Sequence, residues 1–143
     1  MTSARQPGGY SGTPLPRKLG IKPGSRLALI GVPDGFVETL GPLPPDVTVR
    51  ADARATADVV VYCTTRRVDL ERRLERLGRM IAPGGALWVA WPKRASRVAT
   101  DMTEDVVRAV ALPTGLVDNK VVAIDETWSG LRLVWRRELR AGL

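Results

Sequence analysis

The chain has 143 residues, with 22 Lys and Arg against 15 Asp and Glu, a formal net charge of +7, one cysteine and no histidine. This length suits one domain with a core of its own, and the single Cys63 excludes a disulfide framework within the chain. Without histidine, the chain cannot supply a Ser-His-Asp triad or a Cys-His pair, and we expect no metal site.

The first part of the chain predicts a tail, a short helix and a buried strand. Residues 1–12 are rich in Gly, Ser and Pro and are expected to form a flexible tail, ahead of a single domain over residues 13–143. A short helix is expected within residues 14–19. The apolar run over residues 26–30, which Gly31 closes, is typical of a strand buried on both faces of a parallel sheet.

A loop, a short helix and an exposed strand follow. The loop covers residues 31–35 and the helix residues 36–40, while residues 46–52 alternate apolar and polar side chains as an edge strand does. The apolar residues 57–63 predict a second buried strand that ends at Cys63. We expect this cysteine to be a buried small hydrophobe rather than a nucleophile.

An apolar stripe with the spacing i, i+4, i+7 and i+11 predicts the clearest helix of the chain. Its members are Leu70, Leu74, Leu77 and Ile81. The turn Pro83-Gly84-Gly85 ends this helix, and residues 86–91 predict a third buried strand.

Near its end the chain predicts one more helix and two strands. The helix covers about residues 103–112, with Asp101 and Thr103 as candidate N-terminal caps. Residues 120–125 and 131–137 predict two strands, and the turn residues between them favour an antiparallel hairpin.

Buried strands that alternate with helices predict an α/β fold. We expect a three-layer Rossmann-like sandwich whose sheet is mostly parallel and closes with a C-terminal antiparallel hairpin. No window approaches the about 20 apolar residues of a membrane span, and the N-terminus has no apolar run typical of a signal peptide. We therefore expect a cytoplasmic protein without a membrane partner.

Two stretches resemble class I S-adenosylmethionine-dependent methyltransferases. Residues 20–31 (GIKPGSRLALIG) resemble the opening strand of that fold, and residues 74–89 (LERLGRMIAPGGALWV) resemble its later helix, Pro-Gly-Gly turn and strand. The resemblance implies a shortened, degenerate version of the fold. Residues 10–24 and 115–136 also give the whole chain a resemblance to a bacterial domain-of-unknown-function family, which implies no particular chemistry.

The first loop departs from the methyltransferase pattern, acidic-x-Gly-x-Gly-x-Gly. The corresponding residues 29–35 keep two of the glycines, and Pro33 removes one N–H donor. The resemblance places the acidic residue that holds the cofactor ribose at Asp52. The chain has no room between Asp52 and Asp58 for the helix and strand that normally follow. The candidate cofactor-binding residues are Gly31, Asp34, Gly35, Asp52, Thr64 and Thr65.

Basic residues follow two of the predicted buried strands. Open α/β sheets bind ligands beyond the carboxyl ends of their strands, where the strand order reverses. If the strands over residues 26–30 and 57–63 lie side by side there, their loops, residues 31–35 and 64–67, meet, with residues 91–94 close by. The candidate anion-binding residues at this rim are Arg66, Arg67, Lys93 and Arg94. The competing interpretation is that these are solvated loop charges.

These patterns favour a protein without enzymatic activity or cofactor that binds an anionic small molecule or a protein partner at the rim. An alternative, which rests on the resemblance, is an S-adenosylmethionine-dependent methyltransferase with a divergent cofactor loop. A second alternative is a nucleic-acid-binding accessory protein, attracted to phosphates by its charge of +7. The oligomeric state stays open, a homodimer included.

Overall fold

Six strands form one mixed sheet in the computed structural model, which describes residues 12–140. They are β1 (Arg26–Ile30), β2 (Thr48–Arg50), β3 (Ala57–Cys63), β4 (Ile81–Pro92), β5 (Leu116–Ala123) and β6 (Trp128–Trp135). Their order is β2-β1-β3-β4-β6-β5; the first four are parallel, and β6 is antiparallel to both of its neighbours. The predicted mostly parallel sheet with a closing hairpin is confirmed. The tail predicted for residues 1–12 lies outside the described residues, apart from Gly12.

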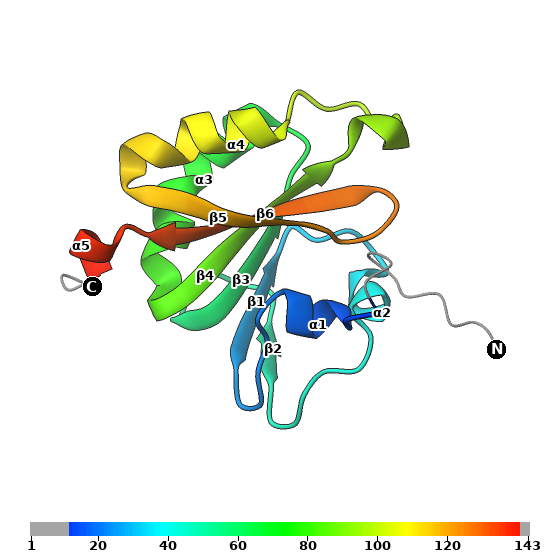
Figure 1. Ribbon diagram of the computed structural model, residues 1–143, viewed down its shortest axis with the longest axis vertical. Coiled ribbons are helices and arrows are strands. Elements are labelled where there is room, and N and C mark those ends of the chain that lie inside the picture. Colours follow the sequence, from blue (N-terminus) through cyan, green and yellow to red (C-terminus); the bar gives the residue numbers. More distant parts are fainter. Residues whose placement is uncertain (1–11, 141–143) are drawn as a thin grey trace.

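Helices cover both faces of this sheet (Figure 1). The helices α3 (Arg67–Met80) and α4 (Glu104–Ala111) pack on one face, and α1 (Leu15–Lys18) and α2 (Phe36–Leu40) pack on the other. A short helix, α5 (Arg137–Arg140), follows β6. This arrangement confirms the predicted α/β sandwich. Across residues 12–140, no helix is long and apolar enough to cross a membrane.

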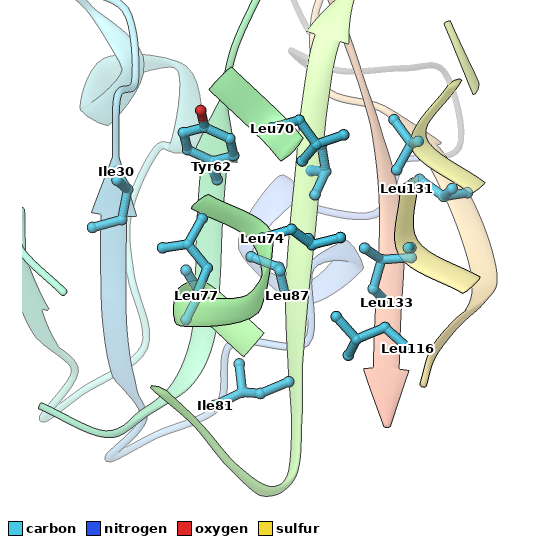
Figure 2. Packing of buried hydrophobic residues seen from close by; sticks show 14 of the residues in the cluster. Ile30, Tyr62, Leu70, Leu74, Leu77, Ile81, Leu87, Leu116, Leu131 and Leu133 are labelled. Atoms are coloured by element: carbon cyan, nitrogen blue, oxygen red, sulfur yellow. The ribbon is translucent and has the colours of Figure 1, made fainter. Parts of the chain in front are cut away.

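The predicted apolar stripe forms the centre of the core on the α3 face (Figure 2). Leu70, Leu74 and Leu77 are at most 1% exposed and share a cluster with the strand residues Tyr62 and Leu87. Full burial stabilises a leucine side chain by about 1.5–3 kcal/mol relative to leaving it exposed. The stripe therefore anchors α3 to the parallel part of the sheet.

The connection from β2 to β3 is short and contains no helix. Arg50 pairs with Ala28 of β1, so β2 ends two residues before β1 does. The chain then crosses back through residues 51–56, and Ala53 packs against the core on the α3 face. The guanidinium of Arg50 donates a hydrogen bond to the carbonyl oxygen of Ala55 at 2.7 Å, which fixes this crossing.

The C-terminal hairpin differs from its predicted boundaries. The strand predicted at residues 120–125 begins at Leu116, and the one predicted at residues 131–137 begins at Trp128. Asp125 explains the earlier start of the second strand, because its Oδ1 accepts the N–H groups of Thr127 and Trp128, both at 2.8 Å. This side-chain turn is tight, so the residues that follow it extend straight into the ladder.

The prediction that the Pro-Gly-Gly turn ends α3 is wrong, because α3 ends at Met80, and Ile81, the last residue of the predicted stripe, already begins β4. The turn therefore lies within β4 rather than before it. The pairing jumps from Ala57 with Ile81 to Val59 with Ala86, so the turn forms a bulge beside β3. A Cβ atom added to Gly85 would lie 2.6 Å from the carbonyl oxygen of Asp58. The close approach of two backbones therefore requires glycine at this position.

An ion pair links β1 and β3 at the edge of the sheet where these two strands begin. Arg26 begins β1, and its Nη2 lies 3.0 Å from Oδ1 of Asp58 in β3. The backbone N–H of Arg26 also donates to Asp58 Oδ2 at 2.8 Å. Hydrogen bonding to the Arg26 guanidinium, the largest cause, holds the pKa of the Asp58 carboxyl below its ordinary value of 3.8.

This ion pair predicts an acid-dependent loss of stability. Because the pKa of Asp58 is lower in the folded chain, the stabilisation is fully present above pH 3.8 and is lost as the pH falls through the folded-state pKa. We expect Asp58→Asn to lower the free energy of unfolding at neutral pH. The difference in this free energy from wild type should shrink as the pH falls below 3.8. Urea unfolding at several pH values measures this, with Glu126→Gln as an exposed control. A difference that is constant with pH would contradict the assignment.

Candidate functional site

The loops after β1 and β3 meet at the carboxyl edge of the sheet, as the sequence predicts. The two strands are neighbours, with Ile30 opposite Tyr62, and the chain leaves β1 toward β2 on one side and returns to β3 on the other. Gly31 has a φ of +65°, and an added Cβ would lie 3.0 Å from the carbonyl oxygen of Cys63. The packing of the two loops is therefore enough to explain the glycine.

The remaining residues of the first loop lead into a very short helix. Gly35 has a φ of +83° and precedes α2, which ends at Leu40. The N–H of Phe36 donates to the carbonyl oxygen of Pro33 at 3.1 Å. Asp34 is exposed at the tip of this loop. The loop is thus stabilised by its own turn and presents one carboxylate to solvent.

The carboxylate of Asp52 is engaged by its own segment. Its Oδ1 accepts the N–H of Arg54 at 3.2 Å and lies 3.8 Å from Nε of Arg50. These contacts hold the crossing from β2 to β3. Asp52 follows β2 as the resemblance implies, and its side chain serves the crossing in this structure.

The turn between β3 and α3 is closed by residues that the chain supplies itself. Thr64 Oγ1 accepts the N–H of Arg66 at 3.1 Å, and the hydroxyl of Thr100 donates to the carbonyl oxygen of Thr65 at 2.6 Å. Asp101 Oδ1 accepts the N–H of Arg67, the first residue of α3, at 2.7 Å. The N-terminus of α3, which follows the candidate residues Thr64 and Thr65, therefore already carries a carboxylate.

Asp101 thus caps a different helix from the one predicted. It was a candidate cap of the helix over residues 103–112, and it caps α3 instead because the chain before α4 passes beside that helix N-terminus. Thr103 caps α4 as predicted, since its hydroxyl accepts the N–H of Val106 at 3.1 Å.

The structure does not bring the four candidate anion-binding residues into one pocket. Arg67 pairs with Glu71 of α3 at 2.9 Å, and Arg66 is the exposed residue before the helix. Lys93 and Arg94 instead line a pocket of about 520 Å³ at the carboxyl end of β4, together with Arg97. The loops after β1 and β3 therefore lie together, while Lys93 and Arg94 belong to a separate pocket after β4.

We call this second feature the rim pocket; it is lined by Trp91 and Pro92 of β4, by parts of residues 93–104 and by Ser129 of β6. Its basic side chains are Lys93, Arg94 and Arg97. Its one carboxylate, Glu104, pairs with Arg108 in the next turn of α4. Arg108 also forms an ion pair with Asp118 at 2.9 Å. The carboxylate of Glu104 therefore belongs to an ion-pair network that does not include the basic residues of the pocket.

Arg97 and Ser129 are pocket residues that the sequence reasoning missed. Arg97 lies three residues after Arg94, so an extended search for basic residues after the strand over residues 86–91 would have included it. Ser129 had no such signal, because the sequence predicts a turn there and the residue lies in β6, opposite Trp91.

Cys63 is a buried residue, as predicted. Its side chain is 4% exposed, and burial, assisted by the negative charge of Asp125, raises the pKa of the thiol to about 12. The nucleophilic form of cysteine is the thiolate. At neutral pH this residue is therefore protonated and inert.

Solved structures similar to this one are methyltransferases, although no protein-family model and no curated protein matches the chain by sequence. A protein assigned as a type 11 methyltransferase from Sulfolobus solfataricus aligns with a TM-score of 0.61 and 12% identity over 85% of this chain and 89% of its own. Magnesium protoporphyrin IX methyltransferase from Synechocystis PCC 6803, solved with bound SAH, aligns with a TM-score of 0.54 and 12% identity over 80% of this chain and 75% of its own.

The pyocyanin biosynthetic protein PhzM has a TM-score of 0.64 and 12% identity over 85% of this chain, which spans 53% of PhzM. At this level of identity the likeness shows the fold alone. The chain therefore has a class I methyltransferase-like fold, as its resemblance implies, in a trimmed form.

The residues around the loops after β1 and β3 do not fit S-adenosylmethionine in the way that the family pattern implies. The acidic position of the loop pattern is Leu29, which is 6% exposed in the core, and Pro33 replaces the middle glycine. Residues 51–56 form neither a helix nor a strand, so the helix and strand that follow the acidic residue in the family pattern are absent. Oδ1 of Asp52 accepts a hydrogen bond within its own segment, and half of its side chain is exposed.

The cap on α3 predicts a measurable contribution to stability. We expect Asp101→Ala to lower the free energy of unfolding by about 1 kcal/mol, because the first amide of α3 loses its acceptor. Asp101→Asn keeps an acceptor oxygen and should lose less. Thermal and urea unfolding measure both variants, and an Asp101→Ala variant as stable as wild type would show that the cap contributes nothing.

Proposed function

We propose that the chain is a non-catalytic protein that binds an anionic ligand in the rim pocket. The observation that carries the proposal is a pocket with three basic side chains, Lys93, Arg94 and Arg97, whose one carboxylate is paired elsewhere. Among residues 12–140, none of the three is in an ion pair. Their charges are therefore available to a ligand.

The position and size of the pocket support this proposal. It opens at the carboxyl end of β4, on the edge where open α/β sheets bind their ligands. Its volume of about 520 Å³ falls within the range of roughly 300–1,000 Å³ that is usual for small-molecule sites.

Backbone contacts hold the basic segment in place before a ligand arrives. The N–H of Lys93 donates to the carbonyl oxygen of Thr127 at 2.7 Å, which ties the segment to the hairpin turn. The hydroxyl of Ser96 donates to the carbonyl oxygen of Lys93 at 2.7 Å and accepts the N–H of Val98. A preorganised segment loses less entropy on binding.

The chemistry of the lining supports binding without catalysis. General acid–base catalysis needs a group that can exchange a proton beside the substrate. The chain has no histidine, and Cys63 is not part of the lining. The only carboxylate of the pocket, Glu104, is held by Arg108.

The double variant Lys93→Ala/Arg94→Ala tests the proposal. We expect millimolar inorganic phosphate to raise the Tm of wild type, because a ligand that binds the folded state stabilises it. The double variant should bind phosphate at least tenfold more weakly in calorimetry. The control Arg72→Ala/Arg76→Ala removes the same charge from the exposed side of α3 and should bind as wild type does.

Two results would contradict the proposal: no anion shifts the Tm, or both double variants lose binding equally. If the chain instead bound an oligonucleotide with a steep salt dependence, and the Lys93→Ala/Arg94→Ala variant did so too, the nucleic-acid alternative would be favoured.

A second candidate function is that of an S-adenosylmethionine-dependent methyltransferase with a divergent cofactor loop. The structural neighbours favour it more than they favour the first proposal, since they are methyltransferases and one was solved with bound SAH. The loops after β1 and β3 also lie where the strand order reverses. The residues of these loops weigh against a methyltransferase, because Leu29 and Pro33 depart from the family pattern.

Titration with S-adenosylhomocysteine separates the two candidates. The anion proposal predicts no saturable heat with this compound and phosphate binding that Asp34→Ala leaves unchanged. The methyltransferase candidate predicts micromolar binding that Asp34→Ala or Asp52→Ala weakens and Lys93→Ala/Arg94→Ala does not. Gly31→Val is unsuitable, because its side chain would collide with the carbonyl oxygen of Cys63.

A further inference from the structure

Arg97 has a backbone conformation that its residue type disfavours. Its φ of 63° and ψ of 12° are left-handed, and within residues 12–140 only Asp46 shares a positive φ among the non-glycine residues. The backbone of Arg97 ends the turn Arg94–Ser96 by donating its N–H to the carbonyl oxygen of Arg94 at 3.1 Å. Glycine would form the same turn with less strain.

The reason for an arginine at this position therefore lies in its side chain and not in its backbone. Strained conformations persist where surrounding structure holds them, and they concentrate at functional sites. Arg97 lines the rim pocket, and its side chain has no ion-pair partner among the described residues. The strained turn thus presents a third cation beside Lys93 and Arg94.

The rim pocket has an apolar floor as well as a basic wall. Trp91 and Met102, which are 6% and 2% exposed, belong to the core beneath α3 and α4 and also line the pocket. Val98 lines it too and is 43% exposed. A bare inorganic anion would contact the basic wall and leave Val98 exposed to water.

We propose that the ligand of the rim pocket is an organic phosphate monoester that carries an apolar ring, with Arg97 as a fixed contact to the phosphoryl group. This inference rests on the proposed anion-binding function and deepens it. Three cations and the hydroxyl of Ser129 suit the charge and the oxygens of a phosphate dianion better than those of a single carboxylate. The ring packs over Val98 beside Trp91 and Met102, which removes the exposed surface of Val98 and the surface of the ring itself from water.

Matched probes test the ligand class. Calorimetry with phenyl phosphate and methyl phosphate compares two monoesters that share the phosphoryl group and differ in the ring. We expect phenyl phosphate to bind at least tenfold more tightly than methyl phosphate, and also more tightly than benzoate, which has the ring and one negative charge.

The outcomes separate this inference from the proposed function. Equal affinities for phenyl phosphate, methyl phosphate and inorganic phosphate, all lost in Lys93→Ala/Arg94→Ala, would overturn the inference and leave the anion proposal standing. Benzoate binding as tightly as phenyl phosphate would also overturn it. No binding by any of these compounds would overturn both.

Arg97→Gly tests the role of the arginine without endangering the fold. Glycine adopts this φ readily, so we expect the Tm of the variant to equal or exceed that of wild type. Its affinity for phenyl phosphate should fall at least tenfold. Asp46→Gly relieves the same kind of strain elsewhere, and Arg76→Ala removes the same charge; both should bind as wild type does. Wild-type affinity in Arg97→Gly would contradict the assignment.

Discussion

The short crossing from β2 to β3 is the constraint on which the carboxyl edge of this sheet depends. Residues 51–56 return the chain to the core, and Arg50 holds them through the carbonyl oxygen of Ala55 at 2.7 Å. Because the crossing carries no helix or strand, β2 is the edge of the sheet. Oδ1 of Asp52 accepts a hydrogen bond within the same crossing. The methyltransferase-like fold is thus kept in a trimmed form.

A second consequence concerns where positive charge stays available. The segment before α4 is fastened to the turn before α3 by Thr100 and Asp101, and Asp101 occupies the first N–H group of that helix. Arg67 is paired with Glu71. Arg66 and the basic residues after β4 have no ion-pair partner in the described part of the chain, and those after β4 share a pocket, which supports the proposed anion site there.

Local patterns predicted the fold well because they report burial directly. The apolar run of β3 matched its strand from Ala57 to Cys63, and the stripe from Leu70 to Leu77 matched α3. The site was harder, since it depends on how distant segments pass one another. The residues around Asp101 do not indicate which of two helix N-termini its side chain caps. The residues around Arg97 do not predict its left-handed backbone conformation. The hairpin boundary failed because Asp125 shortens the turn.

The central claim is that this protein binds anions in the rim pocket after β4 and not at the loops after β1 and β3. A titration of the isotope-labelled protein with inorganic phosphate, followed by amide nitrogen–proton NMR spectra, tests it most directly. The account predicts saturable shifts that concentrate in residues 93–104 and at Ser129, with the amides of residues 31–35 unchanged. Largest shifts at residues 31–35 and Asp52, or shifts that do not saturate anywhere, would contradict it.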